Sequence, residues 1–222
     1  MVGLTGRVVA VNLAVVRTDA FTRVKSGRSG IDKRPVEHPV LLDVGGVEGD
    51  TICDTANHGG PDQAVYAYST DDLQFWAREL GQEFTPGGVG ENLTLDGIDC
   101  SGALVGERWR IGDPDDGPLL QVRGPRIPCR VFAGFREVPD LIKRFLAAGR
   151  PGSYLAVERP GYVRAGDAVT VVERPAHDTT VADVMAIFAG DRSRLGKLVA
   201  AREYLSAEKR EWLERVSARP AV

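Results

Sequence analysis

One of the three cysteines in this 222-residue chain lies where its thiol could be activated. Cys129 ends the segment PRIPC, and Arg123, Arg126 and Arg130 lie close to it in the sequence. Nearby guanidinium groups stabilise a thiolate over a thiol, which makes the sulfur available as a nucleophile or as a soft metal ligand. The same arginines can bind a phosphate in a bidentate manner. The alternative is that Cys129 is a small buried hydrophobic residue beside solvated arginines.

The segment HGGPDQAVYAY places a glycine turn directly before an apolar run with the composition of a strand. Adjacent glycines let backbone N–H groups approach a ligand closely, and the flanking side chains supply polar contacts. The candidate ligand-binding residues here are His58, Gly59, Gly60 and Asp62. The alternative is an ordinary turn that happens to contain a histidine.

Two further segments carry polar residues that could line the same site. In GVGENLTLDG, Glu91 and Asn92 follow a glycine at the head of an alternating strand. Residues 24–39 are basic and contain glycines and serines, so we expect a loop, and this loop includes Lys33 and Arg34. Each segment taken alone is also compatible with an ordinary turn or a solvated surface loop.

Cys129 and His58 could also belong to a hydrolase. Cysteine hydrolases use a thiolate nucleophile, a histidine base and a carboxylate that orients the histidine. The orienting group in this chain would be Asp62 or Glu91. This hypothesis leaves the arginines and the glycine turn unexplained, because a hydrolase site does not require them.

The composition excludes several classes of protein. The formal net charge is −3, so the chain lacks the positive field that holds nucleic acid or an anionic membrane. No apolar run approaches the ~20 residues that cross a bilayer. The odd cysteine count without C-x-x-C spacing argues against disulfides or structural zinc and favours a cytoplasmic protein. Without G-x-G-x-x-G after a strand, and without four cysteines, we expect no flavin, NAD or iron–sulfur site.

The elements that must position these residues are mostly β with some α. Short runs rich in Val, Leu, Ile and Tyr, separated by Gly, Pro and Asp, predict a closed barrel or a sandwich. The predicted strands are residues 7–16, 40–44, 64–68, 104–111, 119–122 and 168–172. Apolar residues at helical spacing, each followed by a glycine, predict helices at 70–80 and at 139–148.

The pattern changes after Glu173, where a linker-like stretch precedes apolar residues at helical spacing. Breaks at Gly190 and at Leu205–Ser206 divide this part into about three short helices. We therefore predict a β domain at 1–173, with its core at about 33–172, and a small helical domain at 174–222. So short a helical part buries little apolar surface alone, and we expect it to dock on the barrel or on another subunit.

Six segments occur in an order and spacing that resembles the MOSC family, the molybdenum cofactor sulfurase C-terminal domain. They are KRPV, VEGD, HGGPDQAVYAY, GENLT, PRIPC and RAGD. HGGPD and PRIPC are the specific segments, and the others support them. The chain looks like the YiiM-like bacterial branch, in which a MOSC β-barrel precedes a three-helix domain. The resemblance covers nearly the whole chain, and a purely structural or interaction role would leave this clustering unexplained.

The resemblance implies a molybdenum cofactor. In the family the cysteine of the PRIPC element binds molybdenum, or accepts sulfur in sulfur-carrying relatives, and this role maps onto Cys129. A soft, anionic thiolate suits a high-valent molybdenum that already has dithiolene ligands. Lys33, Arg34 and Arg126 are the candidates to bind the cofactor's phosphate. The full predicted cofactor-binding set is Lys33, Arg34, His58, Gly59, Gly60, Asp62, Glu91, Asn92, Arg126 and Cys129.

The implied activity is reduction of N-hydroxylated compounds, such as hydroxylamino-purines, to amines. Its candidate catalytic residues are Cys129, His58 and Asn92, with His58 and Asn92 contacting the pterin or the oxo face of the metal. The electrons must then come from a separate reductase, expected to be a flavoprotein, and the helical part is a candidate docking surface for it. The alternative is a carrier that transiently holds a persulfide or the intact cofactor on Cys129. The sequence leaves open whether two copies form a homodimer.

Overall fold

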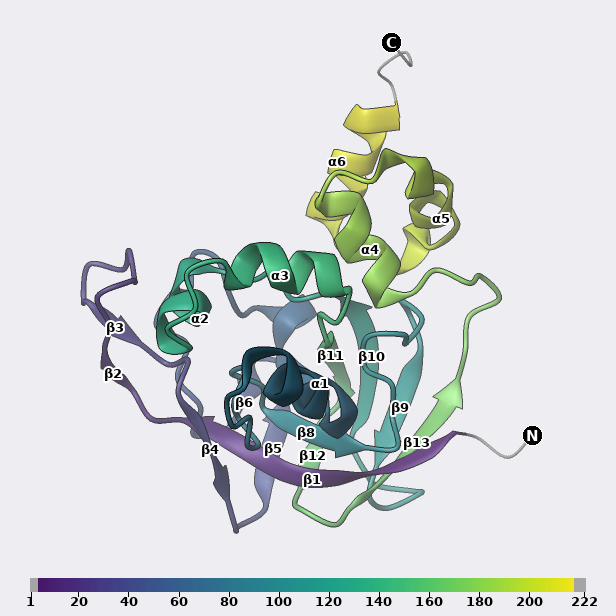
Figure 1. Ribbon diagram of the computed structural model, residues 1–222. Helices are drawn as coiled ribbons and strands as arrows, with labels where there is room; N and C mark the ends of the chain where they lie inside the picture. The colour runs from purple at the N-terminus through teal and green to yellow at the C-terminus, as the bar shows by residue number, and fades with distance from the viewer. Residues whose placement is uncertain (1–3, 218–222) are drawn as a thin grey trace.

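The computed structural model describes residues 4–217, and its centre is a closed β-barrel (Figure 1). Eight strands pair in the order β13, β9, β10, β11, β7, β8, β1 and β4, and β13 also pairs with β1. That pairing closes seven strands into a ring, while β4 pairs with the second half of β1. The strands are β1 (Thr5–Ala14), β4 (Lys33–Val36), β7 (Val65–Ser69), β8 (Leu93–Asp96), β9 (Arg108–Ile111), β10 (Leu119–Gly124), β11 (Ser153–Arg159) and β13 (Ala168–Glu173).

Two smaller sheets accompany the barrel. One contains β12 (Gly161–Val163), β5 (Val40–Asp43) and β6 (Gly46–Val47), and the other pairs β2 (Arg17–Thr18) with β3 (Arg28–Ser29). In the barrel sheet β7 and β8 are parallel. Helix α1 (Thr70–Leu80) lies in the crossover connection that such a pair requires. The predicted class, mostly β with some α around a barrel, is confirmed.

The strand prediction for residues 104–111 was too long. Only Arg108–Ile111 forms a strand, while the residues before it form a turn in which the N–H of Glu107 donates to the carbonyl of Leu104. Gly106 adopts a φ of 94° in this turn, a conformation that side chains with a Cβ rarely take. A Cβ at Gly106 would also collide with the ring of Tyr204.

The basic segment predicted as a loop contains a strand. Lys33–Val36 forms β4 and pairs antiparallel with β1. Successive side chains on a strand point to opposite faces. The Lys33 side chain is therefore buried, at 9% exposure, while that of Arg34 is 65% exposed.

Within residues 4–173, three α-helices cover the barrel. Helix α1 begins at its predicted residue because Ser69 caps it, accepting from the N–H of Asp72, and it ends where Gly81 takes a left-handed conformation. Helix α3 (Leu141–Ala148) begins two residues later than predicted and also ends at a left-handed glycine, Gly149. The short helix α2 (Arg130–Phe135), directly after Cys129, was not predicted.

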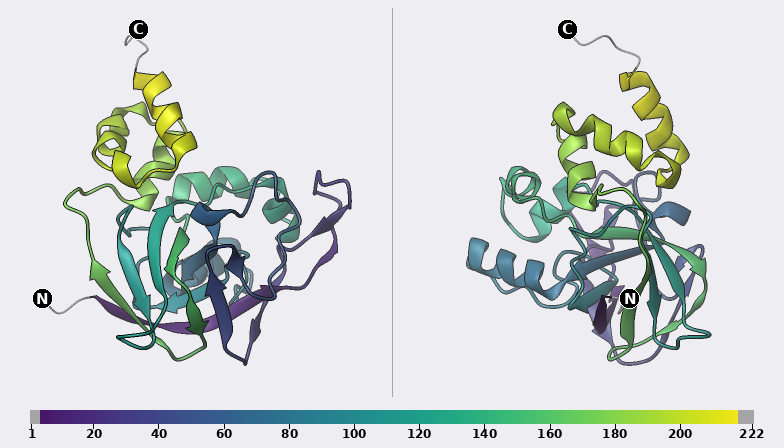
Figure 2. Two further views of the ribbon diagram at one scale, coloured as in Figure 1. Left: turned by 180° about the vertical axis from the view of Figure 1, so that it is seen from behind. Right: turned by 90° about the vertical axis from the view of Figure 1, so that its right-hand side faces the viewer.

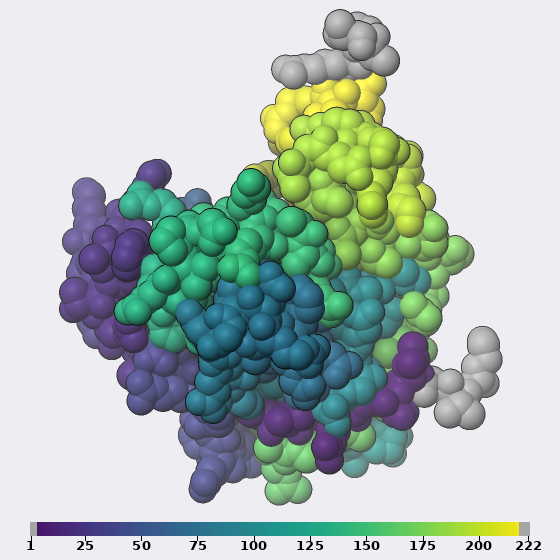
Figure 3. Space-filling view, viewed as in Figure 1, coloured from purple at the N-terminus to yellow at the C-terminus, as the bar shows by residue number. Residues whose placement is uncertain are grey.

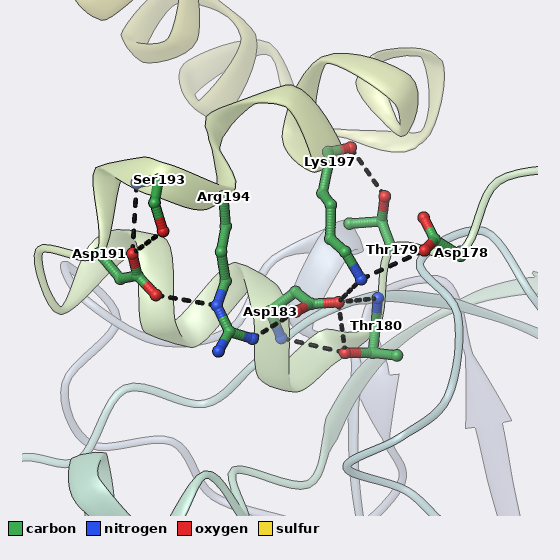
Figure 4. Close-up of polar contacts among 8 residues, drawn as sticks. All are labelled: Asp178, Thr179, Thr180, Asp183, Asp191, Ser193, Arg194 and Lys197. Carbon is green, nitrogen blue, oxygen red and sulfur yellow. Dashed lines mark hydrogen bonds and ion pairs between the residues drawn. The ribbon is translucent and has the colours of Figure 1, made fainter.

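The three predicted C-terminal helices are α4 (Val181–Phe188), α5 (Leu195–Ala200) and α6 (Ala207–Ser217). They lie together at one end of the barrel (Figure 2). Two 3₁₀ turns, at Arg192–Arg194 and Arg202–Tyr204, connect them. Asp183 anchors this arrangement, because its carboxylate forms a capping box with Thr180 and ion pairs with Arg194 and Lys197 (Figure 4).

The helical part docks on the barrel. The sequence had led us to expect docking either on the barrel or on another subunit. Its buried apolar residues belong to the same continuous cluster as the barrel strands, and they are Val181, Val184, Ile187, Leu198, Ala201, Leu205 and Leu213. Met185 belongs to a second cluster, with residues of α1, α2 and α3. In the space-filling view the helices form a lobe that rises from the barrel beside α3 (Figure 3). The barrel and the helices therefore share a hydrophobic core.

Candidate functional site

A cavity of about 590 Å³ opens beside Cys129. Its wall comes from segments far apart in the sequence. They are the β2–β3 hairpin, β4, the loop after β6, the turn before β7 and the start of β7, the loop before β8, the PRIPC segment with α2, and single residues of α3 and β11. Of the predicted site residues, the structure brings six to this wall: Lys33, His58, Gly59, Asn92, Arg126 and Cys129. The segments singled out in the sequence therefore meet at one place.

Cys129 is the N-cap residue of α2, with an extended backbone, and its side chain is partly buried. Burial alone would raise the pKa of its thiol. A hydrogen bond from His58, the charge of Arg126 and the N–H of Phe132 outweigh burial and lower the pKa to about 6. The sulfur is therefore mostly a thiolate at neutral pH, as the surrounding arginines suggested, although Arg126 and His58 are the residues responsible.

Arg126 is a buried cation, with 4% of its surface exposed. Its guanidinium donates to the carbonyl of Val89 and lies over the rings of Phe132, at 4.6 Å, and Tyr66, at 5.3 Å. Burial would lower the pKa of the Arg126 guanidinium, but the charges of Tyr66 and Cys129 hold this pKa above its usual value. No carboxylate within residues 4–217 forms an ion pair with it, so the thiolate or an anionic ligand must balance its charge.

Lys33 and Asn92 are linked by Asp50, which sequence reasoning did not select. The Lys33 ammonium pairs with Asp50, and Asn92 Nδ2 donates to the same carboxylate at 2.9 Å. Burial would raise the pKa of Asp50, but Lys33 and Asn92 hold it below its usual value. Asn92 Oδ1 also accepts from the N–H of Tyr66 at 3.2 Å, which fixes the direction of the amide. Asp50 therefore neutralises Lys33 and positions both side chains in the wall.

Glu91 was predicted to contact the cofactor, but its side chain does not line the cavity. It is fully buried and accepts from the N–H of Gly87 at 2.7 Å, the N–H of Val89 at 3.1 Å and the hydroxyl of Thr94 at 2.8 Å. Burial raises the pKa of this carboxyl. Glu91 thus shapes the loop that holds Asn92 and the Val89 carbonyl, which accepts from Arg126.

Three other predicted residues lie outside the cavity wall. Arg34 points away on β4 and pairs with Asp32 at 3.0 Å. Asp62 pairs with Arg123 at 2.6 Å. Gly60 takes a φ of 82°, a left-handed conformation, at the start of the 3₁₀ turn Pro61–Gln63. The hydrolase hypothesis loses its orienting group, because Asp62 and Glu91 both bond elsewhere.

Sequence reasoning missed several residues of the wall, among them Gln63, Tyr66 and Tyr154. The tyrosine rings lie 5.2 Å apart, and burial raises the pKa of Tyr154, so its hydroxyl stays protonated. Gln63 Oε1 is buried and has no hydrogen-bond partner among the described residues, which leaves an acceptor for a ligand N–H. Gln63 and Tyr66 both belong to the HGGPDQAVYAY segment, whose inward side could be identified only after β7 was placed.

A model of the MOSC domain family matches residues 54–170, more than half of the chain. The chain belongs to the MOSC domain family. The match contains His58, Asn92, Arg126 and Cys129, while Lys33 precedes it and the C-terminal helices follow it.

Named relatives agree with this assignment. Uncharacterized protein YflK of Bacillus subtilis (strain 168) is 32% identical over 167 residues, covering 75% of this chain and 73% of that protein. Protein YiiM of Escherichia coli (strain K12) is 33% identical over 162 residues, covering 72% and 70%. A protein named Reductase from Gibberella moniliformis (strain M3125 / FGSC 7600) is 30% identical over 174 residues, covering 74% of this chain and 30% of that protein.

A solved structure extends the likeness to the helical part. The crystal structure of YiiM from Geobacillus stearothermophilus superposes with a TM-score of 0.75 at 28% identity, covering 95% of this chain and 98% of that one. So broad a match includes α4 to α6 as well as the barrel. Along residues 4–217, no helix is long and apolar enough to cross a bilayer.

The MOSC site fits a molybdenum cofactor in its donor set and its charge. Within the described residues no group of three or more His, Cys, Asp or Glu side chains could hold a metal ion. Cys129 could supply one soft thiolate to a metal whose other ligands come from a cofactor. Arg126 lacks a carboxylate partner, and Gln63 Oε1 lacks a donor, so both can bind an anionic, N–H-bearing ligand. The residues present therefore suit the group that the family implies.

Proposed function

We propose that this MOSC protein holds a molybdenum cofactor on Cys129 and reduces N-hydroxylated compounds, such as hydroxylamino-purines, to amines. The observation that supports this most directly is a thiolate with a pKa of about 6 beside Arg126, a cation that pairs with no carboxylate of residues 4–217. Both residues line one cavity. The name of the Gibberella relative also supports an oxidoreductase. Because that match covers 30% of the relative, the name alone does not assign the activity to the matched part.

The reaction takes up two electrons and two protons, breaks one N–O bond, and releases the amine and one water. When bound, the cofactor supplies the two-electron chemistry of N–O cleavage. Cys129 would hold the metal through its thiolate, from its place as the N-cap residue of α2 and directly after Pro128, whose own φ is fixed. His58 hydrogen-bonds the sulfur and lines the cavity, which makes its imidazole the candidate proton donor.

The anionic part of the cofactor needs cations that no carboxylate neutralises. Asp50 neutralises Lys33, which makes Lys33 a weaker phosphate partner than its position in the sequence suggested. Arg126 is buried in the wall, and Arg23, Arg28 and Arg130 line the cavity from exposed positions. We therefore assign phosphate binding to this arginine set, with Arg126 as its buried member.

We further propose that a separate flavoprotein reductase supplies the electrons, in the cytoplasm. A docking test by removal of residues after Glu173 is unsuitable, because the C-terminal helices share the barrel core and their loss would expose it. Single substitutions at exposed helical residues are the better probe. Val199, 52% exposed on α5, is the first choice, and Val199→Glu should slow reduction with the natural donor while leaving reduction with a small chemical reductant unchanged.

The test of the proposed activity uses protein purified from a host that makes the cofactor. Conversion of 6-N-hydroxylaminopurine to adenine is followed chromatographically with a small chemical reductant, for wild type, Cys129→Ser and Cys53→Ser. Cys53 lines the same cavity, so it is a matched control. We expect turnover in wild type and Cys53→Ser and none in Cys129→Ser.

Two results would contradict the proposal. Equal turnover in Cys129→Ser would remove the thiolate from the reaction. A wild-type protein that contains molybdenum but turns over no N-hydroxylated compound would instead support the carrier hypothesis.

A further inference from the structure

An ion pair outside the cavity connects the two segments that carry the candidate site. Arg123 Nε donates to Asp62 Oδ1 at 2.6 Å, and Arg123 Nη1 donates to Gln121 Oε1 at 2.8 Å. Asp62 follows His58 in the HGGPD turn, and Arg123 precedes Cys129 at the end of β10. The pair therefore bridges the His58 turn and the Cys129 segment. The Arg123 side chain is 16% exposed and that of Asp62 39% exposed, so water screens the pair from the Asp62 side.

Lys209 of α6 reaches the same place from the C-terminal helices. Its ammonium lies 3.4 Å from the carbonyl of Arg123 and is attracted by the charge of Asp62. It also lies directly against Gly124, where an added Cβ would be 2.9 Å from Lys209 Nζ. Burial lowers the pKa of this lysine, which agrees with a side chain enclosed between α6 and β10. No carboxylate among residues 4–217 forms an ion pair with Lys209 within 4.0 Å. Its ammonium contacts the backbone carbonyl of Arg123, while the charge of Asp62 attracts it and the charge of Arg123 repels it.

The C-terminal helices also belong to the apolar cluster beside the Cys129 segment. Met185 of α4, 1% exposed, belongs to the apolar cluster that contains Tyr66 and Phe132 and against which Cys129 packs. Phe132 lies in α2, the helix that Cys129 caps, and its ring contacts the Arg126 guanidinium. The C-terminal helices thus contact the Arg123 end of the Cys129 segment through Lys209 and join the apolar cluster beside that segment through Met185.

We propose that the C-terminal helices position the candidate site, with Arg123, Asp62 and Lys209 as positioning residues that hold the His58 turn against the Cys129 segment. The proposal concerns the scaffold of the site and does not depend on which ligand or reaction the site serves. It assigns Asp62 a role different from the cofactor contact predicted from its motif.

Two backbone hydrogen bonds report whether the His58 turn is held in place. The N–H of His58 donates to the carbonyl of Asp54 at 3.0 Å, and the N–H of Gln63 donates to the carbonyl of Gly60 at 3.0 Å. If the bridge restrains the turn, its loss lets these bonds open more often while the core bonds of the barrel stay closed. Hydrogen exchange at the two amides measures that opening directly.

The experiment compares hydrogen exchange by mass spectrometry in cofactor-free wild type, Arg123→Gln, Arg123→Lys and Lys209→Met. Arg7→Gln is the matched control, because Arg7 also joins two segments through an ion pair, with Asp96, but on the far end of β1. Removing a charged hydrogen bond should speed exchange in peptides spanning 55–63 by about tenfold in Arg123→Gln. We expect a smaller, severalfold increase in Lys209→Met, and rescue to near the wild-type rate in Arg123→Lys, which keeps the charge.

Other results would overturn the proposal. Exchange at 55–63 that matches wild type in both Arg123→Gln and Lys209→Met would show that the bridge does not restrain the turn. Exchange that rises equally along the whole chain, or equally in Arg7→Gln, would show a loss of global stability instead of positioning. If Arg123→Gln does not fold, Lys209→Met and Arg123→Lys carry the same comparison. A local increase in exchange together with no N-hydroxy reductase activity in wild type would leave the positioning role intact and reject the proposed function.

Discussion

Replacing His58 with alanine should raise the pKa of the Cys129 thiol, because the hydrogen bond from His58 is the strongest of the interactions that lower it. At a pKa of about 6, thiolate exceeds thiol about tenfold at pH 7. Without His58, burial of the sulfur opposes only Arg126 and the N–H of Phe132. A rise of one unit would leave about half of the sulfur as thiolate at pH 7, and a rise of two units about one tenth.

The assay is the alkylation rate of Cys129 in cofactor-free protein between about pH 5 and about pH 9, because the thiolate is the reacting form. Rates are read on the Cys129 peptide by mass spectrometry, since Cys53 lines the same cavity. The wild-type rate should reach half its plateau near pH 6, and the midpoint for His58→Ala should lie higher. His38→Ala, at an exposed histidine, is the control. A wild-type midpoint near pH 9.0, the ordinary pKa of a thiol, would show that the Cys129 thiol is not activated. An unchanged midpoint in His58→Ala would show that His58 does not lower this pKa.

Three further substitutions test the scaffold by urea denaturation. Glu91→Gln should lower the unfolding free energy by about 1–3 kcal/mol, because the new amide NH₂ would face a hydrogen-bond donor in a buried site. An unchanged urea midpoint would contradict the three hydrogen bonds that Glu91 accepts. Leu213→Ala, at a 3% exposed site, should cost about 2–5 kcal/mol in one cooperative transition, whereas separate unfolding of the helices would argue against a shared core. Burial would raise the pKa of Asp183, but Lys197, Thr180 and Arg194 lower it to about 2. The ionised carboxylate therefore stabilises the fold fully at a pH above its ordinary pKa of 3.8, and this stabilisation is lost as the pH falls toward the folded-state pKa of about 2. Asp183→Asn should therefore destabilise the protein at pH 7 by more than at pH 3, and an equal cost at both would count against the ion pairs.

Local signals were enough to predict most elements. Helix α1 matched its predicted range because a serine cap, acidic first-turn residues and a terminal glycine all lie within the element. Strand β4 was not predicted, because KRPV has neither alternation nor an apolar run, and only its pairing with β1 makes it a strand. Strand β11 was missed as well, although it lies between β10 and β7 in the barrel.

Proximity in a motif was a weaker guide to the cavity than the direction of each side chain. Lys33 and Arg34 are neighbours of similar charge, yet the strand turns one inward and the other outward. Glu91 and Asn92 are also neighbours, and only Asn92 reaches the cavity wall. Asp50 ends VEGD, one of the six segments, but only its contacts with Lys33 and Asn92 reveal its role. Tyr154 lies in none of those segments, and its position depends on how distant strands pair.

Cys129 is the proposed molybdenum ligand, and the first experiment is elemental analysis of molybdenum per protein. Wild type, Cys53→Ser and Cys129→Ser are purified from a host that makes the cofactor. We expect near-stoichiometric molybdenum in wild type and Cys53→Ser, and its loss in Cys129→Ser because the thiolate beside Arg126 is gone. Molybdenum retained in Cys129→Ser at the wild-type level, or absent from all three proteins, would contradict it.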